Sequence, residues 1–247
     1  YGPFHIIMAL LYQLHPLFPK FLYFLSWKAL EIFALIRTYP QTKNMLAVFL
    51  VFNFPFFWLE IPIWGHMESL MALFTIIGIG LFYQKKDFLA GAFISLGFLI
   101  KVIPLIILPF LAFHRFKFRW RVLLGFVFAT AVAYSIAYYY WGPSFINSFV
   151  YAVKRPSTHF SFFRFFIGNL SPFQIFGISN LDRFSVPLIG LCNISFFTAY
   201  FLGKINLKTS ILCTLLITLT FYKVGYAQYY EYYFLVLFSL IFTFSQK

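Results

Sequence analysis

The sequence has 247 residues, of which 62% are hydrophobic and 10% are charged. A soluble domain usually contains about 45–50% apolar residues, so the composition argues against a soluble fold and predicts an integral membrane protein. Cys192 and Cys213 lie in apolar runs without metal-ligand spacing, so neither a disulfide framework nor a zinc site is predicted. The 19 Lys and Arg residues outnumber the 6 Asp and Glu residues, but they form short clusters between apolar runs. Such clusters are typical of membrane topology, and we expect no nucleic-acid binding.

The apolar runs predict the membrane-spanning elements. A helix needs about 17 to 25 residues to cross a bilayer, and the runs are continuous rather than alternating, which favours helices over a barrel. We therefore expect an all-α, multi-pass transmembrane helical bundle with about 8 to 9 membrane helices. The candidate spans lie near residues 21–36, 45–58, 67–83, 87–113, 122–140, 184–202, 209–223 and 228–244.

The N-terminal segment is shorter than the predicted spans. The first 16 residues form a run too short to span, and we expect them to lie along the membrane interface. The chain begins at Tyr1 without a charged-then-apolar leader. We expect residues 1–247 to form a single membrane-embedded domain, with an N-terminal helix and a first external loop preceding Tyr1.

The run from 87 to 113 decides the predicted topology. As one helix it would be about 40 Å long, more than a moderately tilted span needs. Pro104 in "KVIP" fits the first turn of a second helix and cannot be hydrogen-bonded inside a continuous one. A break there also places the "RFKFRWR" cluster on the same side as Lys85 and Lys86. The positive-inside tendency makes that side cytoplasmic, so we predict two short helices in this run.

This topology gathers most other charged groups at the opposite, non-cytoplasmic face, where we expect the active site. The connection from 141 to 183 is polar but rich in Phe, as a segment lying in the interface would be. The candidate site residues at this face are Glu60, His66, Glu68, Lys101, Lys154, Arg155, His159, Arg164, Gln228, Tyr229 and Glu231.

Lys101 is the most informative of these residues. A Lys at the centre of a membrane helix costs about 2.5–3.5 kcal/mol, so it is rarely left without a partner or a task. At the tip of a helix hairpin it would lie at the height of the lipid phosphates. It could then simply reach the interface, or it could bind a lipid-linked phosphate as a point charge.

Glu68 and His66 stand at the start of an apolar run, directly after Gly65. A Glu in the first turn is favoured by the helix dipole, which alone can explain Glu68. The second carboxylate, Glu60, lies eight residues upstream and is not explained in this way. Two carboxylates facing one site can accept hydrogen bonds from sugar hydroxyls, or one of them can serve as a general base.

The segment "VKRPSTHFSFFRFF" supplies Lys154, Arg155, His159 and Arg164. Such cations at an interface bind anionic lipid headgroups, or they stabilise the charge that builds on a departing phosphate. The last apolar run opens with "AQYYEYY", which contains Gln228, Tyr229 and Glu231. Tyrosines at a membrane interface are ordinary, so each of them counts for little by itself.

Taken together, these motifs resemble the GT-C superfamily of polyprenyl-phosphate-sugar-dependent glycosyltransferases. They are similar to the GPI mannosyltransferase I family and to the bacterial and archaeal DUF2029-type mannosyltransferases, which show Gly-x-x-Glu/Asp at a helix start, then Ala-Gly, then Lys-x-x-Pro, and a late Gln-Tyr. The His-x-Ser that follows Lys154 and Arg155 is less similar to their central external-loop motif. The matching positions are Gly65 and Glu68, Ala90 and Gly91, Lys101 and Pro104, His159 and Ser161, and Gln228 and Tyr229.

The resemblance implies an activity and roles for these residues. It implies transfer of a sugar, most simply mannose, from a polyprenyl-phosphate donor to an acceptor glycan or glycolipid, with inversion at the anomeric carbon. Glu68 is the catalytic candidate. The donor phosphate would be bound by Lys101, Lys154, Arg155, His159 and Arg164. The sugar or acceptor would be bound by Glu60, His66, Gln228, Tyr229 and Glu231.

The resemblance also implies partners, and the sequence departs from the family's pattern at one point. Membrane lipids and a small membrane-protein partner are expected, in the plasma membrane of a prokaryote or the endoplasmic reticulum of a eukaryote. A divalent metal would be compatible with this chemistry, but the chain shows no metal-ligand motif, so no metal ligand is predicted. The family's first external loop usually carries an acidic residue, whereas the Asp residues here are Asp87 and Asp182. We therefore expect the principal base to lie upstream of Tyr1.

Two other classes also keep ionisable residues within the membrane. A transporter or lipid flippase is the main alternative, but the sequence shows no internal repeat and no matched pair of broken helices. A membrane acyltransferase is a further alternative, although no His-Asp or Ser-His-Asp arrangement stands out.

Overall fold

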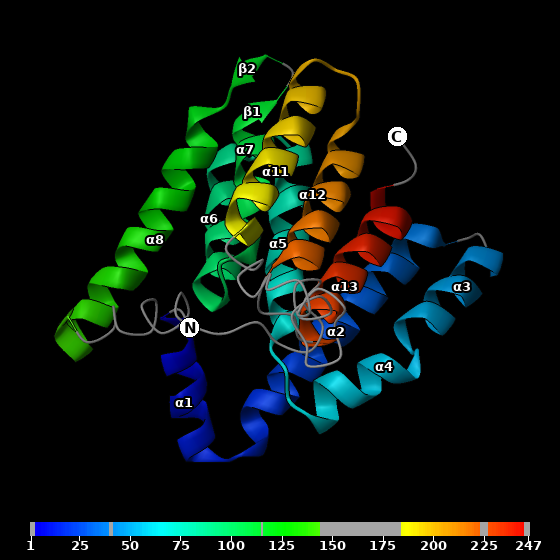
Figure 1. The fold of residues 1–247 in the computed structure, drawn as a ribbon. Coiled ribbons are helices and arrows are strands. Elements are labelled where there is room, and N and C mark those ends of the chain that lie inside the picture. Colours follow the sequence, from blue (N-terminus) through cyan, green and yellow to red (C-terminus); the bar gives the residue numbers. More distant parts are fainter. Residues whose placement is uncertain (1–2, 40–41, 115, 144–183, 223–226, 245–247) are drawn as a thin grey trace, which may run out of the picture.

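The computed structural model describes residues 3–39, 42–114, 116–143, 184–222 and 227–244. These residues are mostly helical, which confirms the all-α fold class. The elements are α1 (Phe4–Leu14), α2 (Leu17–Thr38), α3 (Thr42–Phe52), α4 (Pro55–Trp58), the π-helix η1 (Leu59–Ile63), α5 (Glu68–Tyr83), α6 (Asp87–Ile100), the 3-10 helix η2 (Ile103–Ile107), α7 (Leu108–Ala112), β1 (Phe113–His114), β2 (Lys117–Phe118), α8 (Trp120–Trp141), α11 (Ser185–Phe201), α12 (Leu207–Phe221) and α13 (Ala227–Phe244). Figure 1 shows them as a bundle in which α5 lies at the centre.

The predicted break in the run from 87 to 113 is confirmed. Helix α6 ends at Ile100, and Lys101 follows in an extended conformation with φ −147° and ψ 153°. Pro104 then lies in the first turn of η2, where its missing N–H removes no helical hydrogen bond. The chain returns through η2 and α7 to the short β1–β2 hairpin.

Two ion pairs fix the directions of these helices. At one end of α6, Lys101 pairs with Glu68, the first residue of α5. At the other end, Arg119 donates to Asp87 at 2.9 Å just before α8 begins. Helices α6 and α8 therefore run parallel, and Lys101 and Arg119 lie at opposite ends of α6, which is about 21 Å long.

Another predicted span is interrupted. The run 45–58 is divided between α3 and α4, and the axis bends by 42° between Asn44–Phe52 and Pro55–Ile63. By length and composition, α8 is long and apolar enough to cross a bilayer, and this bent pair qualifies if it is counted as one span. The other apolar helices that meet the composition test in the described part of the chain are shorter. The count of 8 to 9 membrane helices therefore stays a prediction.

A buried polar network links α2 to the end of α3. Lys28 Nζ donates to Glu31 Oε2 at 2.8 Å and to Asn53 Oδ1 at 2.7 Å, and Asn53 Nδ2 donates to Glu31 Oε1 at 2.6 Å. The ammonium also lies 3.9 Å from the centre of the Trp27 ring and 5.0 Å from that of Trp58. Sequence analysis did not single out this network, in which each charge has a partner.

Helices α6 and α8 pack backbone against backbone. A Cβ on Gly91 would lie 1.9 Å from the carbonyl oxygen of Val122, and a Cβ on Gly125 would lie 1.9 Å from that of Phe88. Small residues allow this approach, which is a common way for membrane helices to associate. The Ala-Gly motif at Ala90 and Gly91 is therefore explained by helix packing.

We predict that Gly91→Ala destabilises the protein strongly. The added methyl group clashes with a carbonyl that cannot move by itself, so we expect a loss of about 3 kcal/mol or more in the free energy of unfolding. The matched control is Gly190→Ala in α11, because among the described residues no atom outside its own helix lies within 4 Å of the position that a Cβ would take. Denaturant unfolding of the purified variants measures both values. Equal stability of the two variants would disprove the close crossing.

Candidate functional site

The candidate site lies at one end of the bundle, where several helices begin, end or change type. The π-helix η1, the start of α5 and the turn after α6 converge there, and α13 packs beside α5 and α2 (Figure 1). Gly65 turns the chain between η1 and α5 with φ +75°, a conformation that side chains rarely adopt. A π-helical turn is uncommon and is often found at functional sites.

The Lys101–Glu68 ion pair forms one half of the site. The Glu68 side chain is 1% exposed and that of Lys101 is 12% exposed. The Lys101 ammonium also lies 4.7 Å from the centre of the Tyr229 ring, which is a cation–π contact. The second carboxylate oxygen of Glu68, Oε2, is buried and makes no hydrogen bond within the described part of the chain. The Lys101 ammonium is thus fixed by Glu68 and Tyr229 and is slightly exposed, whereas the Glu68 carboxylate is buried.

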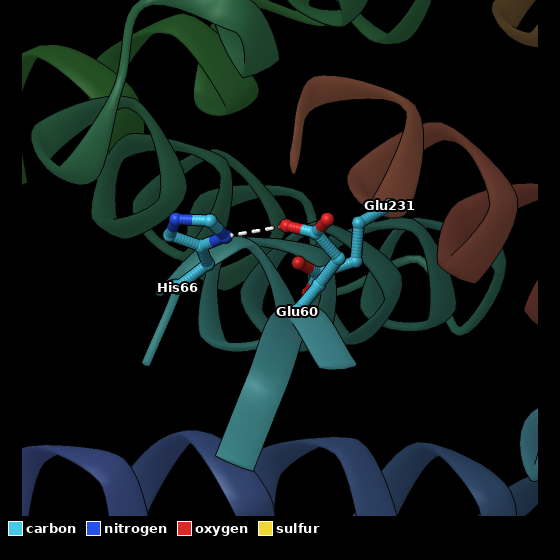
Figure 2. Close-up of side chains that lie close together, drawn as sticks. All are labelled: Glu60, His66 and Glu231. Atoms are coloured by element: carbon cyan, nitrogen blue, oxygen red, sulfur yellow. Dashed lines mark hydrogen bonds and ion pairs between the residues drawn. The ribbon is translucent and has the colours of Figure 1, made fainter. Parts of the chain in front are cut away.

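Glu60, His66 and Glu231 form the other half, and Figure 2 shows their side chains pointing toward one another. His66 Nδ1 donates to Glu60 Oε2 at 2.6 Å. One ligand atom from each of the three residues lies within 4.8 Å of those from the other two. The Glu231 side chain is fully buried, and neither of its oxygens makes a hydrogen bond to another described side chain, although the backbone of Ser69 stabilises its charge.

The two halves share one electrostatic environment. Glu231 is repelled by the charges of Glu68 and Glu60 and is attracted by Lys101. This part of the described structure thus contains three carboxyl groups, Glu60, Glu68 and Glu231, and Lys101 is the cation that acts on Glu68 and Glu231. A buried negative charge is costly without a partner, so the site favours a bound cation, a proton or a ligand that donates hydrogen bonds.

The structure tests the sequence predictions as far as its described residues extend. It brings together Glu60, His66, Glu68, Lys101, Tyr229 and Glu231. Gln228 is half-buried in the first turn of α13, next to Tyr229. The remaining predicted residues lie outside the described part of the chain: Lys154, Arg155, His159 and Arg164.

Lys20 is a residue of this region that sequence analysis missed. Its Nζ donates to the carbonyl oxygen of Ile63 at 2.8 Å, and its side chain packs over Gly65. Lys20 therefore ties the loop that carries Glu60 and His66 to α2. No motif marks it, because the contact joins residues 43 positions apart.

Sequence analysis found no metal-ligand motif, but the structure brings together three side chains of metal-ligating type. Glu60, His66 and Glu231 offer ligand atoms close enough for one ion. They form no recognisable motif because Glu231 lies on α13, far along the chain from η1.

Comparison with known proteins gives one match. The family model described as glycosyltransferase family 87 matches residues 1–192 of the 247. The matched region contains Glu60, His66, Glu68 and Lys101, whereas Glu231 lies beyond it. No curated protein and no solved structure gives a significant match.

We predict strong energetic coupling between Lys101 and Glu68. Lys101→Met leaves Glu68 buried without its partner and should lower the free energy of unfolding by about 3–5 kcal/mol. Adding Glu68→Leu removes that unpaired charge and should restore most of the loss. The double-mutant cycle is measured by denaturant unfolding.

The control cycle uses Arg119→Met and Asp87→Asn, because these side chains are 24% and 19% exposed. Coupling there should be smaller, at about 1 kcal/mol or less. A Lys101–Glu68 coupling no larger than that of the control pair would show that the buried pair is not a dominant interaction.

Proposed function

Because this chain belongs to glycosyltransferase family 87, we propose that it transfers mannose from a polyprenyl-phosphate donor to an acceptor glycan or glycolipid. Membership of a glycosyltransferase family favours this activity over the transporter or flippase alternative. The observation that carries the proposal is the position of Lys101. Its ammonium pairs with Glu68 and attracts Glu231 at the end of the bundle where α6 breaks.

Lys101 has the properties that recognition of a donor phosphate requires. An ammonium carries three N–H donors, and Glu68 accepts from it through one oxygen. The Lys101 side chain is partly exposed, so a donor remains for a phosphate arriving from outside. A preorganised cation at the departing phosphate is the kind of electrostatic stabilisation that usually contributes most to catalysis.

Glu68 is our candidate for the catalytic carboxylate, and its role depends on Lys101. In the unliganded site the ammonium of Lys101 pairs with Glu68. When the ammonium turns toward a donor phosphate, Glu68 is left to accept the proton of the acceptor hydroxyl. A single displacement of this kind inverts the anomeric carbon. The free Oε2 atom of Glu68 leaves a lone pair available for this step.

The remaining residues are suited to binding hydroxyl groups. Carboxylates accept hydrogen bonds only, and sugars offer many O–H donors. Glu60 and His66 are 13% and 29% exposed, so a sugar or acceptor can reach them. Gln228 and Tyr229 precede Glu231 on α13, and the Tyr229 ring contacts Lys101. The residues Lys154, Arg155, His159 and Arg164 keep their proposed role at the donor phosphate.

The surface of α8 supports a membrane position for this site. Its exposed side chains include Leu124, Val127 and Phe128 in the middle of the helix. Arg119 and Arg121 lie at its first end, and the exposed residues Tyr138 to Trp141 lie at its last end. Basic residues at one end and aromatic residues at the other are typical of a membrane helix with a cytoplasmic basic end. Because α6 and α8 are parallel, Lys101 belongs to the non-cytoplasmic end of this arrangement.

Lys101→Ala should abolish transfer. The variant loses the cation at the donor phosphate, and we expect transfer of radiolabelled mannose from polyprenyl-phosphate-mannose in isolated membranes to fall by at least about 100-fold. Lys204→Ala is the matched control, since Lys204 is an exposed cation in the turn after α11. Both variants are compared at equal amounts of membrane-inserted protein. Wild-type activity in Lys101→Ala would remove Lys101 from the site.

Single cysteines should report that Lys101 and the β1–β2 hairpin face opposite sides of the membrane. Val102→Cys and Phe116→Cys suit this test because both side chains are more than half exposed. Cys192 and Cys213 are first replaced by Ser, and a membrane-impermeant thiol reagent is applied to sealed vesicles of each orientation. We expect Val102→Cys to react from the non-cytoplasmic side and Phe116→Cys from the cytoplasmic side. Labelling of both from one side would contradict the topology.

A further inference from the structure

We infer that Glu60, His66 and Glu231 form a binding site for one divalent metal ion, for which Mn²⁺ is a suitable probe. The three side chains converge from η1, from the loop before α5 and from α13 (Figure 2). The assignment rests on the chemistry of these groups and stands whether or not the proposed sugar transfer is correct.

The spacing of the ligand atoms suits a single ion. Nitrogen and oxygen ligands bind transition-metal ions at about 2.0–2.2 Å, so two ligands of one ion lie at most about 4.4 Å apart. The candidate ligand atoms of the three residues lie within 4.8 Å of one another. His66 and Glu60 are already in contact at 2.6 Å and would separate slightly around an ion. Small rotations of the side chains are therefore sufficient to complete the site.

Glu231 provides an independent indication that something is bound. It is fully buried, its two oxygens make no hydrogen bond to another described side chain, and it points toward Glu60 and His66. The backbone of Ser69 stabilises its charge, but no described side chain neutralises it by direct contact. Glu31, the comparable buried carboxylate of α2, receives Lys28 on one oxygen and Asn53 on the other. The fold thus provides partners for one buried carboxylate and leaves the other aimed at two metal-ligating side chains.

The charge of the region also favours a divalent cation. Glu60, Glu68 and Glu231 carry three negative charges when ionised, and Lys101 balances one of them. A single divalent ion would neutralise the remaining two. It would also offset the charge repulsion between Glu60 and Glu231.

The ligand types narrow the choice of ion. Carboxylates suit Mg²⁺, Ca²⁺ and Mn²⁺, whereas imidazole suits Zn²⁺, Fe²⁺ and related ions. One imidazole with two carboxylates therefore fits Mn²⁺ and Zn²⁺ better than Mg²⁺ and Ca²⁺, and Zn²⁺ binds such ligands more tightly than Mn²⁺ does. Glu60 and His66 remain partly exposed, so water or an oxygen of a substrate can occupy the other coordination positions.

The direct test measures metal binding by the purified full chain in detergent. After treatment with EDTA and its removal, Mn²⁺ is added and the electron paramagnetic resonance signal of free Mn²⁺ is followed. We expect the wild-type chain to bind one Mn²⁺ with Zn²⁺ as a competitor. Glu231→Gln and His66→Gln should each weaken binding by roughly tenfold or more.

The control is Glu31→Gln, which alters a buried carboxylate outside the group and should leave Mn²⁺ binding unchanged. Circular dichroism and gel filtration verify that each variant is folded. His66→Gln is the second variant because His66 is partly exposed and tolerates substitution better than Glu231. Absence of stoichiometric Mn²⁺ binding by the wild type, or unchanged binding by folded Glu231→Gln and His66→Gln, would overturn the site. Neither result depends on sugar transfer, which the Lys101→Ala assay tests separately.

Discussion

The buried negative charge at one end of the bundle is the constraint on which the site depends. Glu68 and Glu231 are both fully buried there, and Lys101 is the cation that reaches them. Lys101 can do so because the backbone leaves the helix at that residue, with Pro104 three positions later. A continuous α6 would carry the ammonium past Glu68. The ion pair therefore depends on the helix break, because the break places Lys101 next to Glu68.

The contacts between α6 and α8 hold the opposite end of α6 in place. Asp87 and Arg119 pair there, and Gly91 and Gly125 let α6 and α8 approach closely. The close crossing holds the two helices parallel, so the basic residues gather at one end and the Lys101 turn at the other. Separation of charge along the bundle thus follows from helix packing together with the reversal of the chain through η2 and α7.

Local features of the sequence predict much of this structure. The apolar runs predict the helices, and Pro104 with its nearby charges predicts the break at Lys101. Sequence analysis also assigned Glu60, His66, Glu68 and Lys101 to one end of the bundle. The contact of Glu231 with the first two of these residues could not be predicted in detail. It depends on the rotation of α13 and on the π-helical turn of η1, neither of which leaves a periodic signal. Metal-ligand motifs are recognised by short spacing, and this group has none.

Two clusters of polar side chains in the bundle differ in how far their hydrogen bonds are satisfied. Lys28, Glu31 and Asn53 satisfy one another, and the Trp27 ring covers the ammonium, so that cluster needs nothing from outside. Such a network can hold two helices in register, and both oxygens of its carboxylate are already hydrogen-bonded. At the other cluster, Glu231 and one oxygen of Glu68 have no hydrogen-bond partner among the described residues. A buried polar atom without a hydrogen-bond partner destabilises a fold unless a ligand supplies the partner. We therefore expect the second cluster to bind a ligand.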